Sequence, residues 1–126
     1  MKKALITGAT RGIGRAIAEE LGKDHHVIAG ASWDAAGVVD KLPSAEPFEV
    51  DLRDPAAIRE ATRGIEELDV LVLNAGVLHK GPFEELDDDI WRETLDLNVL
   101  APVILTRELL PALRRSCLLY TSDAAD

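Results

Sequence analysis

Apolar residues along the chain form short blocks that alternate with longer segments of helical periodicity. Four blocks have the length of buried strands and are predicted to be strands: residues 3–6, 26–31, 47–50 and 70–73. Between the blocks, apolar side chains recur every three or four positions, which indicates helices with one buried face. These positions are Ile13, Ile17 and Leu21 in a first helix, and Ile58, Ala61, Ile65 and Leu68 in a second. Residues 32–42 have no clear pattern.

Helix-boundary signals support this alternation. Asp54 and Pro55 favour a helix start, because Asp is a good N-cap and Pro suits the first helical position. A long helical region is predicted over residues 87–113, with Pro102 kinking or dividing it. Its acidic opening suits the positive end of a helix, an interpretation that we favour over metal binding. Strands alternating with helices predict an α/β fold with right-handed β-α-β units and a doubly wound parallel sheet.

Composition narrows the classes of partner and compartment. The 126 residues carry a formal charge of −9, which argues against nucleic acid or an anionic membrane as a partner. The longest mostly apolar run, residues 99–105, is far shorter than the roughly 20 residues of a membrane span, so a cytoplasmic protein is expected. Cys117 is the only cysteine, which excludes a disulfide framework. The three histidines are not spaced like a metal site, and no metal is expected.

Three glycines lie between the first predicted strand and the helix that follows it. Gly8 allows a tight turn, Gly12 leaves the backbone open to a phosphate, and Gly14 lets the helix pack close to the strand. The start of the helix would present free N–H groups and a positive dipole end to an anion. This arrangement predicts a site for a nucleotide diphosphate. The spacing is G-x-x-x-G-x-G rather than the common G-x-G-x-x-G.

The segment from Thr7 to Gly14 resembles the cofactor-binding motif of the short-chain dehydrogenase/reductase family. Three more segments match that family in order: Asp51-Leu52, Asn74-Ala75-Gly76, and Asn98 between Leu97 and Val99. The resemblance covers roughly residues 2–115. It implies a Rossmann-type sheet, truncated here after about four strands, in the order 3-2-1-4.

The same resemblance implies a function for the parent protein. It would be an NAD(P)-dependent oxidoreductase that transfers a hydride between the cofactor and a small carbonyl or alcohol substrate. The last helix commonly packs in a subunit interface in this family, so a homo-oligomer is expected. The alternative function is a non-catalytic NAD(P)-binding sensor or regulatory module on the same fold.

The resemblance also assigns roles to individual residues. The predicted cofactor-binding residues are Gly8, Thr10, Arg11, Gly12, Ile13, Gly14, Ser32, Asp51, Leu52, Asn74, Ala75 and Gly76. Asp51 would accept a hydrogen bond from the adenine amino group, and residues 74–76 would lie under the cofactor. Asn98, the one predicted catalytic residue, would interrupt its helix and hold a water in a proton relay. The alternatives are structural: a turn-capping Asp51, a simple turn at residues 74–76, and a buried amide at Asn98.

Cofactor choice depends on the end of the second strand. No acidic residue stands there to bind a ribose and repel a 2′-phosphate. Arg11 could reach a 2′-phosphate and Ser32 could add a neutral hydrogen bond, so NADP(H) is favoured over NAD(H). In the alternative, Asp34 binds the ribose and selects NAD(H). Trp33 and Trp91 are interpreted as packing residues, with ligand platforms as the alternative.

The last ten residues, 117–126, fit nothing before them. They resemble the translation of a sequencing-adapter DNA, so residues 1–116 are interpreted as the N-terminal part of an NAD(P)-binding domain and the rest as a non-native tail; a natural C-terminus is the alternative. The family's catalytic Ser and Tyr-x-x-x-Lys normally lie beyond this point. Tyr120 is the only tyrosine, and Ala124 stands where the Lys would be. The chain is therefore expected to be an inactive fragment.

Overall fold

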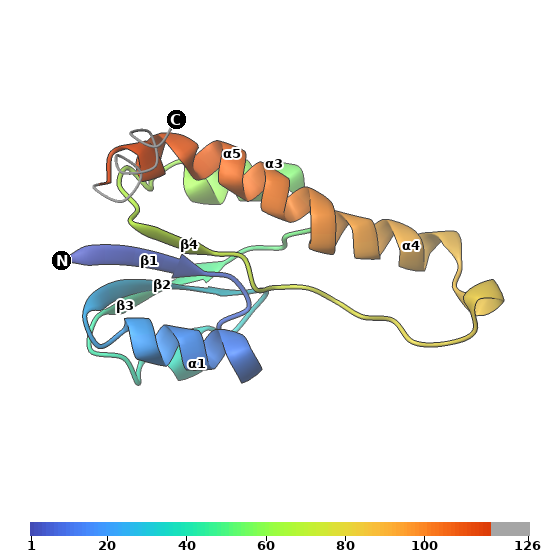
Figure 1. The fold of residues 1–126 in the computed structure, drawn as a ribbon, viewed down its shortest axis with the longest axis horizontal. Helices are drawn as coiled ribbons and strands as arrows, with labels where there is room; N and C mark the ends of the chain where they lie inside the picture. The colour runs from blue at the N-terminus through green and yellow to red at the C-terminus, as the bar shows by residue number, and fades with distance from the viewer. Residues whose placement is uncertain (117–126) are drawn as a thin grey trace, which may run out of the picture.

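A single parallel sheet organises the chain. The structure, a computed structural model, describes residues 1–116, so the predictions made for residues 117–126 lie outside the described part. The strands are β1 (Lys2–Ile6), β2 (His25–Ala31), β3 (Ala45–Glu49) and β4 (Val70–Val72). All pairs are parallel and the order is β3-β2-β1-β4, which confirms the predicted order (Figure 1).

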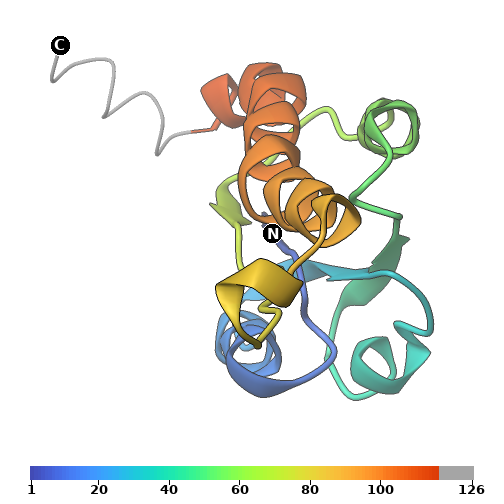
Figure 2. The same ribbon diagram turned by 90° about the vertical axis from the view of Figure 1, so that its right-hand side faces the viewer.

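Helices cover both faces of this sheet, as the end-on view in Figure 2 shows. One face carries α1 (Gly12–Leu21) and α2 (Ala36–Val39), and the other carries α3 (Pro55–Thr62) and α5 (Ala101–Arg114). Alternation along β1 divides the core, because successive strand side chains point to opposite faces. Leu5 packs in the cluster with Ile58 and Leu105, whereas Ala4 and Ile6 pack in the cluster on the α1 side. The doubly wound α/β class is thereby confirmed.

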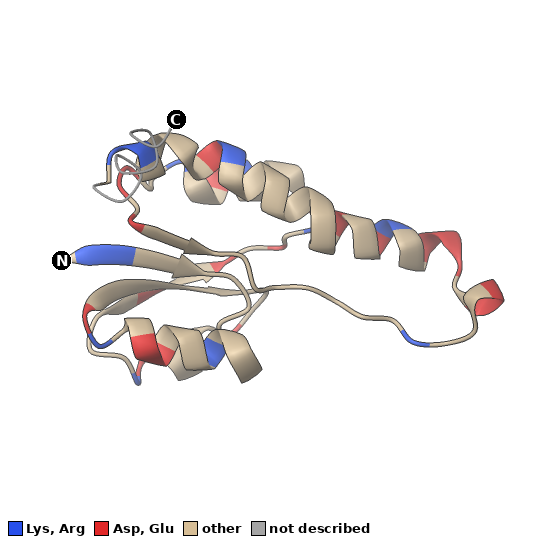
Figure 3. Ribbon diagram, viewed as in Figure 1, with Lys and Arg blue, Asp and Glu red and all other residues tan. Residues whose placement is uncertain are grey.

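The predicted helical region after residue 87 is present but has three parts. They are α4 (Asp88–Leu95), the π-helical segment η2 (Asp96–Leu100) and α5. Pro102 lies in the first turn of α5, so the break in the α-helical pattern precedes the proline. Asp87 caps α4 by accepting a hydrogen bond from the Ile90 amide at 3.0 Å. Acidic residues gather at this end, which extends beyond the sheet (Figure 3).

The second predicted helix is shorter than its periodicity indicated. Asp54 caps α3 as expected and accepts hydrogen bonds from the amides of residues 56 and 57 at 3.0 and 3.4 Å. The helix ends at Thr62, shortly before Gly64, so Ile65 and Leu68 lie in the connection to β4. Leu68 is nevertheless fully buried in the core. The apolar spacing thus marked core positions correctly while overstating the length of the helix.

Strand β4 stands at one edge of the described sheet. It was expected to extend to Leu73 and to be covered on both faces, but it ends at Val72 and its residues are half-buried. Leu73 is exposed beyond the end of the strand. After Leu73, an extended connection runs out past the sheet to η1 (Phe83–Glu85), which precedes α4 (Figure 1). Within residues 1–116, no helix has the length and apolar character needed to cross a membrane.

Candidate functional site

A cavity of about 910 Å³ lies at the carboxyl ends of the strands. Its size is at the upper end of the range for small-molecule sites. In doubly wound sheets, ligands bind at this edge, where the strand order reverses. The predicted cofactor residues that line it are Gly8, Thr10, Arg11, Gly12, Ile13, Ser32, Asp51, Leu52, Asn74, Ala75 and Gly76. Of the predicted set, only Gly14 does not line the cavity.

Gly14 does not face the cavity but lies against the backbone of the loop formed by residues 8–14, which we call the glycine loop. A side-chain carbon on Gly14 would overlap the carbonyl oxygen of Gly8 and lie 2.8 Å from its carbonyl carbon. It would also overlap the side-chain nitrogen of Asn74. The close approach of α1 to the end of β1 therefore requires glycine at this position.

The other two glycines shape the surface that faces the cavity. Gly8 and Gly12 have φ angles of 64° and 59°, in the left-handed region that glycine adopts most easily. A side-chain carbon on Gly12 would meet no atom within 4 Å. Arg11 precedes α1 in an extended conformation, and its side chain makes no capping hydrogen bond to this helix end. The first N–H groups of α1 are thus left for an anion, so this loop fits the diphosphate of a dinucleotide.

Side chains at the ends of β1 and β4 hold this loop in place. The buried Thr7 hydroxyl accepts hydrogen bonds from the amides of Asn74 and Ala75, both at 2.9 Å. The Asn74 side chain donates to the carbonyl oxygens of Thr7 and Gly8, both at 3.2 Å. Segments 66 to 68 residues apart in sequence are thereby fixed to each other. The loop conformation therefore depends on β4.

Asn98 lies in η2 and bonds to the chain that follows β4. Its Oδ1 accepts from the Val77 amide at 2.9 Å, and its Nδ2 donates to the Val77 carbonyl oxygen at 2.8 Å. Asn98 is exposed, so the interpretation of it as a buried amide is wrong, although both of its amide atoms are bonded to Val77. An amide oxygen has two lone pairs and an NH₂ group has two hydrogens, so Asn98 keeps capacity for one more partner at each atom.

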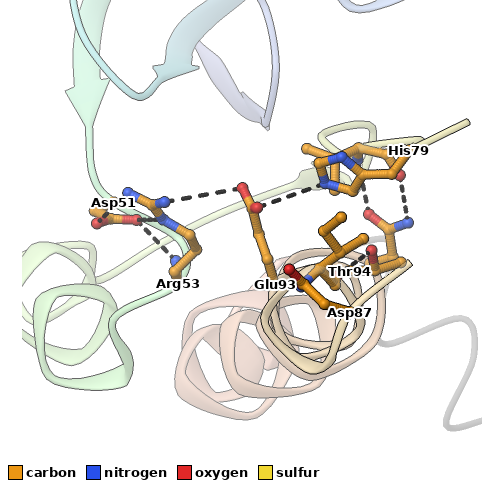
Figure 4. Close-up of polar contacts among 9 residues, drawn as sticks. Asp51, Arg53, His79, Asp87, Glu93 and Thr94 are labelled. Carbon is orange, nitrogen blue, oxygen red and sulfur yellow. Dashed lines mark hydrogen bonds and ion pairs between the residues drawn. The ribbon is translucent and has the colours of Figure 1, made fainter. Parts of the chain in front are cut away.

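An ion-pair chain crosses the rim of the cavity (Figure 4). Asp51 accepts three hydrogen bonds from Arg53, two from the guanidinium at 3.0 and 3.2 Å and one from its backbone amide at 3.0 Å. The Arg53 guanidinium also lies 3.8 Å from Glu93 on α4, and Glu93 lies 3.5 Å from His79. The pKa of Asp51 is lowered, chiefly by the side-chain hydrogen bonds from Arg53 and then by the backbone one.

Three residues relevant to cofactor choice differ in position. Arg11 and Ser32 both line the cavity, and no ion pair engages the Arg11 guanidinium within residues 1–116. Asp34, the alternative ribose ligand, is not among the lining residues and has a φ of 55°. Trp33 does line the cavity and is 74% exposed, so it does not pack in the core as expected. Trp91 contacts Phe83, with ring centroids 5.9 Å apart.

Comparison with known proteins identifies the fold and its family. The family model for short chain dehydrogenases matches residues 2–117. The chain belongs to the short-chain dehydrogenase/reductase family. It is 40% identical over 108 residues to the 2,3-dihydro-2,3-dihydroxybenzoate dehydrogenase of Bacillus subtilis, covering 77% of this chain and 41% of that protein. It is 35% identical to human 17-beta-hydroxysteroid dehydrogenase type 1, covering 88% of this chain and 38% of that protein.

Two solved structures agree with this fold. A metagenomic short-chain oxidoreductase in complex with NADP superposes with a TM-score of 0.81 at 33% identity, covering 89% of this chain and 56% of that one. RhlG of Pseudomonas aeruginosa in a complex with NADP also has a TM-score of 0.81, at 31% identity, covering 91% of this chain and 49% of that one. This chain therefore spans about half the length of the family members it matches.

Several residues that line this cavity were not predicted from the sequence. Thr7 was noted only as the residue before the glycines, although its hydroxyl joins β1 to β4. Gly30 lets β2 approach β1, because a side-chain carbon there would lie 2.7 Å from the Ile6 carbonyl oxygen. A glycine inside a predicted strand was the available signal. No sequence pattern pointed to Arg53 or Glu93, because their ion pair joins segments that are distant in sequence. No group of three or more potential metal ligands occurs in the described part of the chain.

Proposed function

We propose that the whole protein transfers a hydride between NADP(H) and a small carbonyl or alcohol substrate. Residues 1–116 would form the N-terminal part of its cofactor-binding domain. The main support is the glycine loop: its uncapped helix start and the open space at Gly12 face the same cavity as Asp51 and Asn74. When bound, the cofactor supplies the redox chemistry, and these residues would bind and orient it.

The preference for NADP(H) over NAD(H) rests on charge at the cavity wall. Arg11 and Ser32 line the cavity and would bind a 2′-phosphate, whereas Asp34, which would repel one, does not line it. Two similar solved structures, at 33% and 31% identity, are complexes with NADP. Asp51 would bind the adenine amino group, with Arg53 holding the carboxylate ionised.

Titrating the 126-residue chain with NADPH and NADH by calorimetry tests both the function and the preference. We expect tighter binding of NADPH. Arg11→Glu should weaken NADPH binding by about 10-fold or more, through loss of one charge-assisted contact and addition of a repulsive one, and should change NADH binding much less.

Arg15→Glu is the matched control for that variant. It makes the same change of charge four residues further along, inside α1, but Arg15 pairs with Glu19 and does not line the cavity. Tighter binding of NADH, or equal effects of Arg11→Glu and Arg15→Glu, would contradict the assignment. If the chain binds neither NADPH nor NADH, the proposed function itself is contradicted.

Asn98 is proposed to hold a water of the proton relay, as the resemblance implies. Its remaining hydrogen-bonding capacity beside Val77 supports this role. In the whole protein, Asn98→Ala should lower kcat and alter its pH profile while leaving cofactor affinity nearly unchanged. A variant with normal kcat and an unchanged pH profile would make Asn98 purely structural.

The 126-residue chain itself should bind cofactor without reducing a carbonyl substrate. Its sequence contains no Tyr-x-x-x-Lys pair to handle the substrate proton. Loss of NADPH absorbance with any aldehyde or ketone substrate, catalysed by the purified chain, would contradict the expected inactivity. We also propose that residues 117–126 do not belong to the natural protein.

The whole protein is also proposed to be a homo-oligomer. Support comes from apolar side chains that are 44–55% exposed along α4, η2 and α5: Leu95, Val99, Leu100 and Val103. Light scattering on the whole protein should give a multiple of the monomer mass, reduced by Val103→Asp. A monomer at all concentrations would refute this part of the proposal.

A further inference from the structure

Trp33 is a large aromatic side chain at the wall of the cavity, and most of it is exposed. It is 74% exposed, although tryptophan is among the side chains most favourable to bury. Within residues 1–116 the one aromatic pair is Phe83 with Trp91, so Trp33 stacks on no other ring. Its exposure at a cavity, rather than on an outer helix face, is what requires an explanation.

The backbone on both sides of Trp33 is fixed. The carbonyl oxygen of Ala31 accepts a hydrogen bond from the Val50 amide at 3.0 Å, which joins the ends of β2 and β3. Two residues after Trp33, Ala35 is fully buried and its amide donates to the Glu49 carboxylate at 2.8 Å. Between these anchors, Asp34 adopts a left-handed conformation, which non-glycine residues adopt rarely. The turn therefore positions Trp33 rather than leaving it at a frayed end.

The side chains beside Trp33 define the chemistry that fits there. Ser32, Asp51, Leu52 and Arg53 line the same cavity, and they follow the neighbouring ends of β2 and β3. Asp51 is an ionised acceptor with lone pairs left beyond its bonds to Arg53, and Leu52 is apolar. A planar ring with an amino group matches this set: the ring stacks on an aromatic face and the amino group donates to a carboxylate.

We propose that Trp33 is the stacking platform for the adenine ring of the cofactor and sets affinity for its adenosine half. This inference rests on the proposed function, because it takes the cavity to be a dinucleotide site. Indole faces stack on any base, so Trp33 contributes affinity without choosing between the 2′-phosphorylated and unphosphorylated cofactors. That choice stays with Arg11 and Ser32.

The test uses the 126-residue chain with Trp91→Phe, which leaves Trp33 as its only tryptophan. Trp91 does not line the cavity. Adenosine 2′,5′-bisphosphate should change the emission of Trp33 saturably, whereas nicotinamide mononucleotide should not. Trp33→Ala, measured by calorimetry, should weaken binding of adenosine 2′,5′-bisphosphate and NADPH by about 10-fold. Trp33→Phe should recover most of that loss, because it restores an aromatic face.

The possible results separate this proposal from the function it rests on. If the chain binds NADPH and Trp33→Ala binds it with unchanged affinity, the platform role is wrong and the proposed function stands. If the unaltered chain binds neither NADPH nor adenosine 2′,5′-bisphosphate, both are overturned. If Trp33 emission depends on protein concentration and not on nucleotide, a second copy covers the indole and the proposal fails. Trp33 is mostly exposed, so replacing it by Ala or Phe should leave the protein folded. Circular dichroism would check this for each variant.

Discussion

Replacing the glycines of the loop one at a time should separate its binding surface from its support. Gly12→Ala places a side-chain carbon where no atom lies within 4 Å, at a φ of 59°. The left-handed conformation costs a non-glycine residue about 1–2 kcal/mol, so this variant should fold with a moderate loss of stability. The added carbon would nevertheless stand in the space assigned to the diphosphate. We therefore expect at least about a 10-fold loss of NADPH affinity, or about 1.4 kcal/mol.

Gly14→Ala should act in the opposite way. Its added carbon overlaps the Gly8 carbonyl oxygen, a backbone atom that cannot rotate aside. Overpacking of this kind costs about 1–3 kcal/mol, and we take the upper end, against a gain in helix propensity of up to about 1 kcal/mol. The free energy of unfolding of Gly14→Ala should therefore fall by about 2 kcal/mol. Its affinity for NADPH should fall only to the extent that the glycine loop is displaced. Gly64→Ala, with open space and an ordinary φ, is the control and should change neither quantity.

Urea denaturation would give the stabilities of these variants, and calorimetry on the folded protein would give the affinities. The decisive comparison is Gly12→Ala against the unaltered chain. If Gly12→Ala binds NADPH with unchanged affinity, no phosphate approaches this turn and the diphosphate site is misplaced. If Gly14→Ala is as stable as the unaltered chain, the close contact between α1 and Gly8 does not exist in solution.

Three further substitutions test the frame around the cavity. Asp54→Ala should lower the free energy of unfolding by about 1 kcal/mol, measured in urea, through loss of the N-cap of α3. Thr7→Val should cost about 1–3 kcal/mol for each of the two amides left without an acceptor, whereas Thr7→Ser should retain both bonds. Arg53→Ala should raise the pKa of Asp51, measurable by NMR titration. Because pairing lowers the pKa of Asp51 in the folded state, its stabilisation is present above the unfolded pKa and disappears as pH falls through the folded one. The stabilities of Arg53→Ala and the unaltered chain should therefore converge in acid.

Local signals in the sequence were enough to predict most of the sheet and one wall of the site. The strand order followed from alternation and family resemblance, and the cap at Asp54 depends only on residues 54–57. The glycine loop was equally local, because its turn and the start of α1 lie within seven residues. These features could be read from the sequence since the interacting groups are neighbours in the chain.

The errors arose where position depends on the rest of the fold. Leu68 continues the apolar period of α3 yet lies beyond the helix, because burial against α5 does not require helical backbone. Trp33 was assigned to packing on residue type, and only the anchored turn at the ends of β2 and β3 shows that it faces the cavity. Asn98 was expected to be a buried amide because its neighbours are apolar, but it is exposed, and its partner Val77 could not be named before the path after β4 was known.

Hydrogen bonds join the glycine loop to the end of the edge strand β4, so the stability of one depends on the other. Thr7 and Asn74 fix the loop to the end of β4, and β4 pairs with β1 through only three residues. The other side of β4 has no strand partner among residues 1–116, and such an edge opens or associates more readily than a paired strand. Opening of β4 would release Asn74 and free Gly8 from its position. Nucleotide that binds only the closed loop must therefore stabilise β4 as well, and protection of the β4 amides from hydrogen exchange should rise with NADPH concentration.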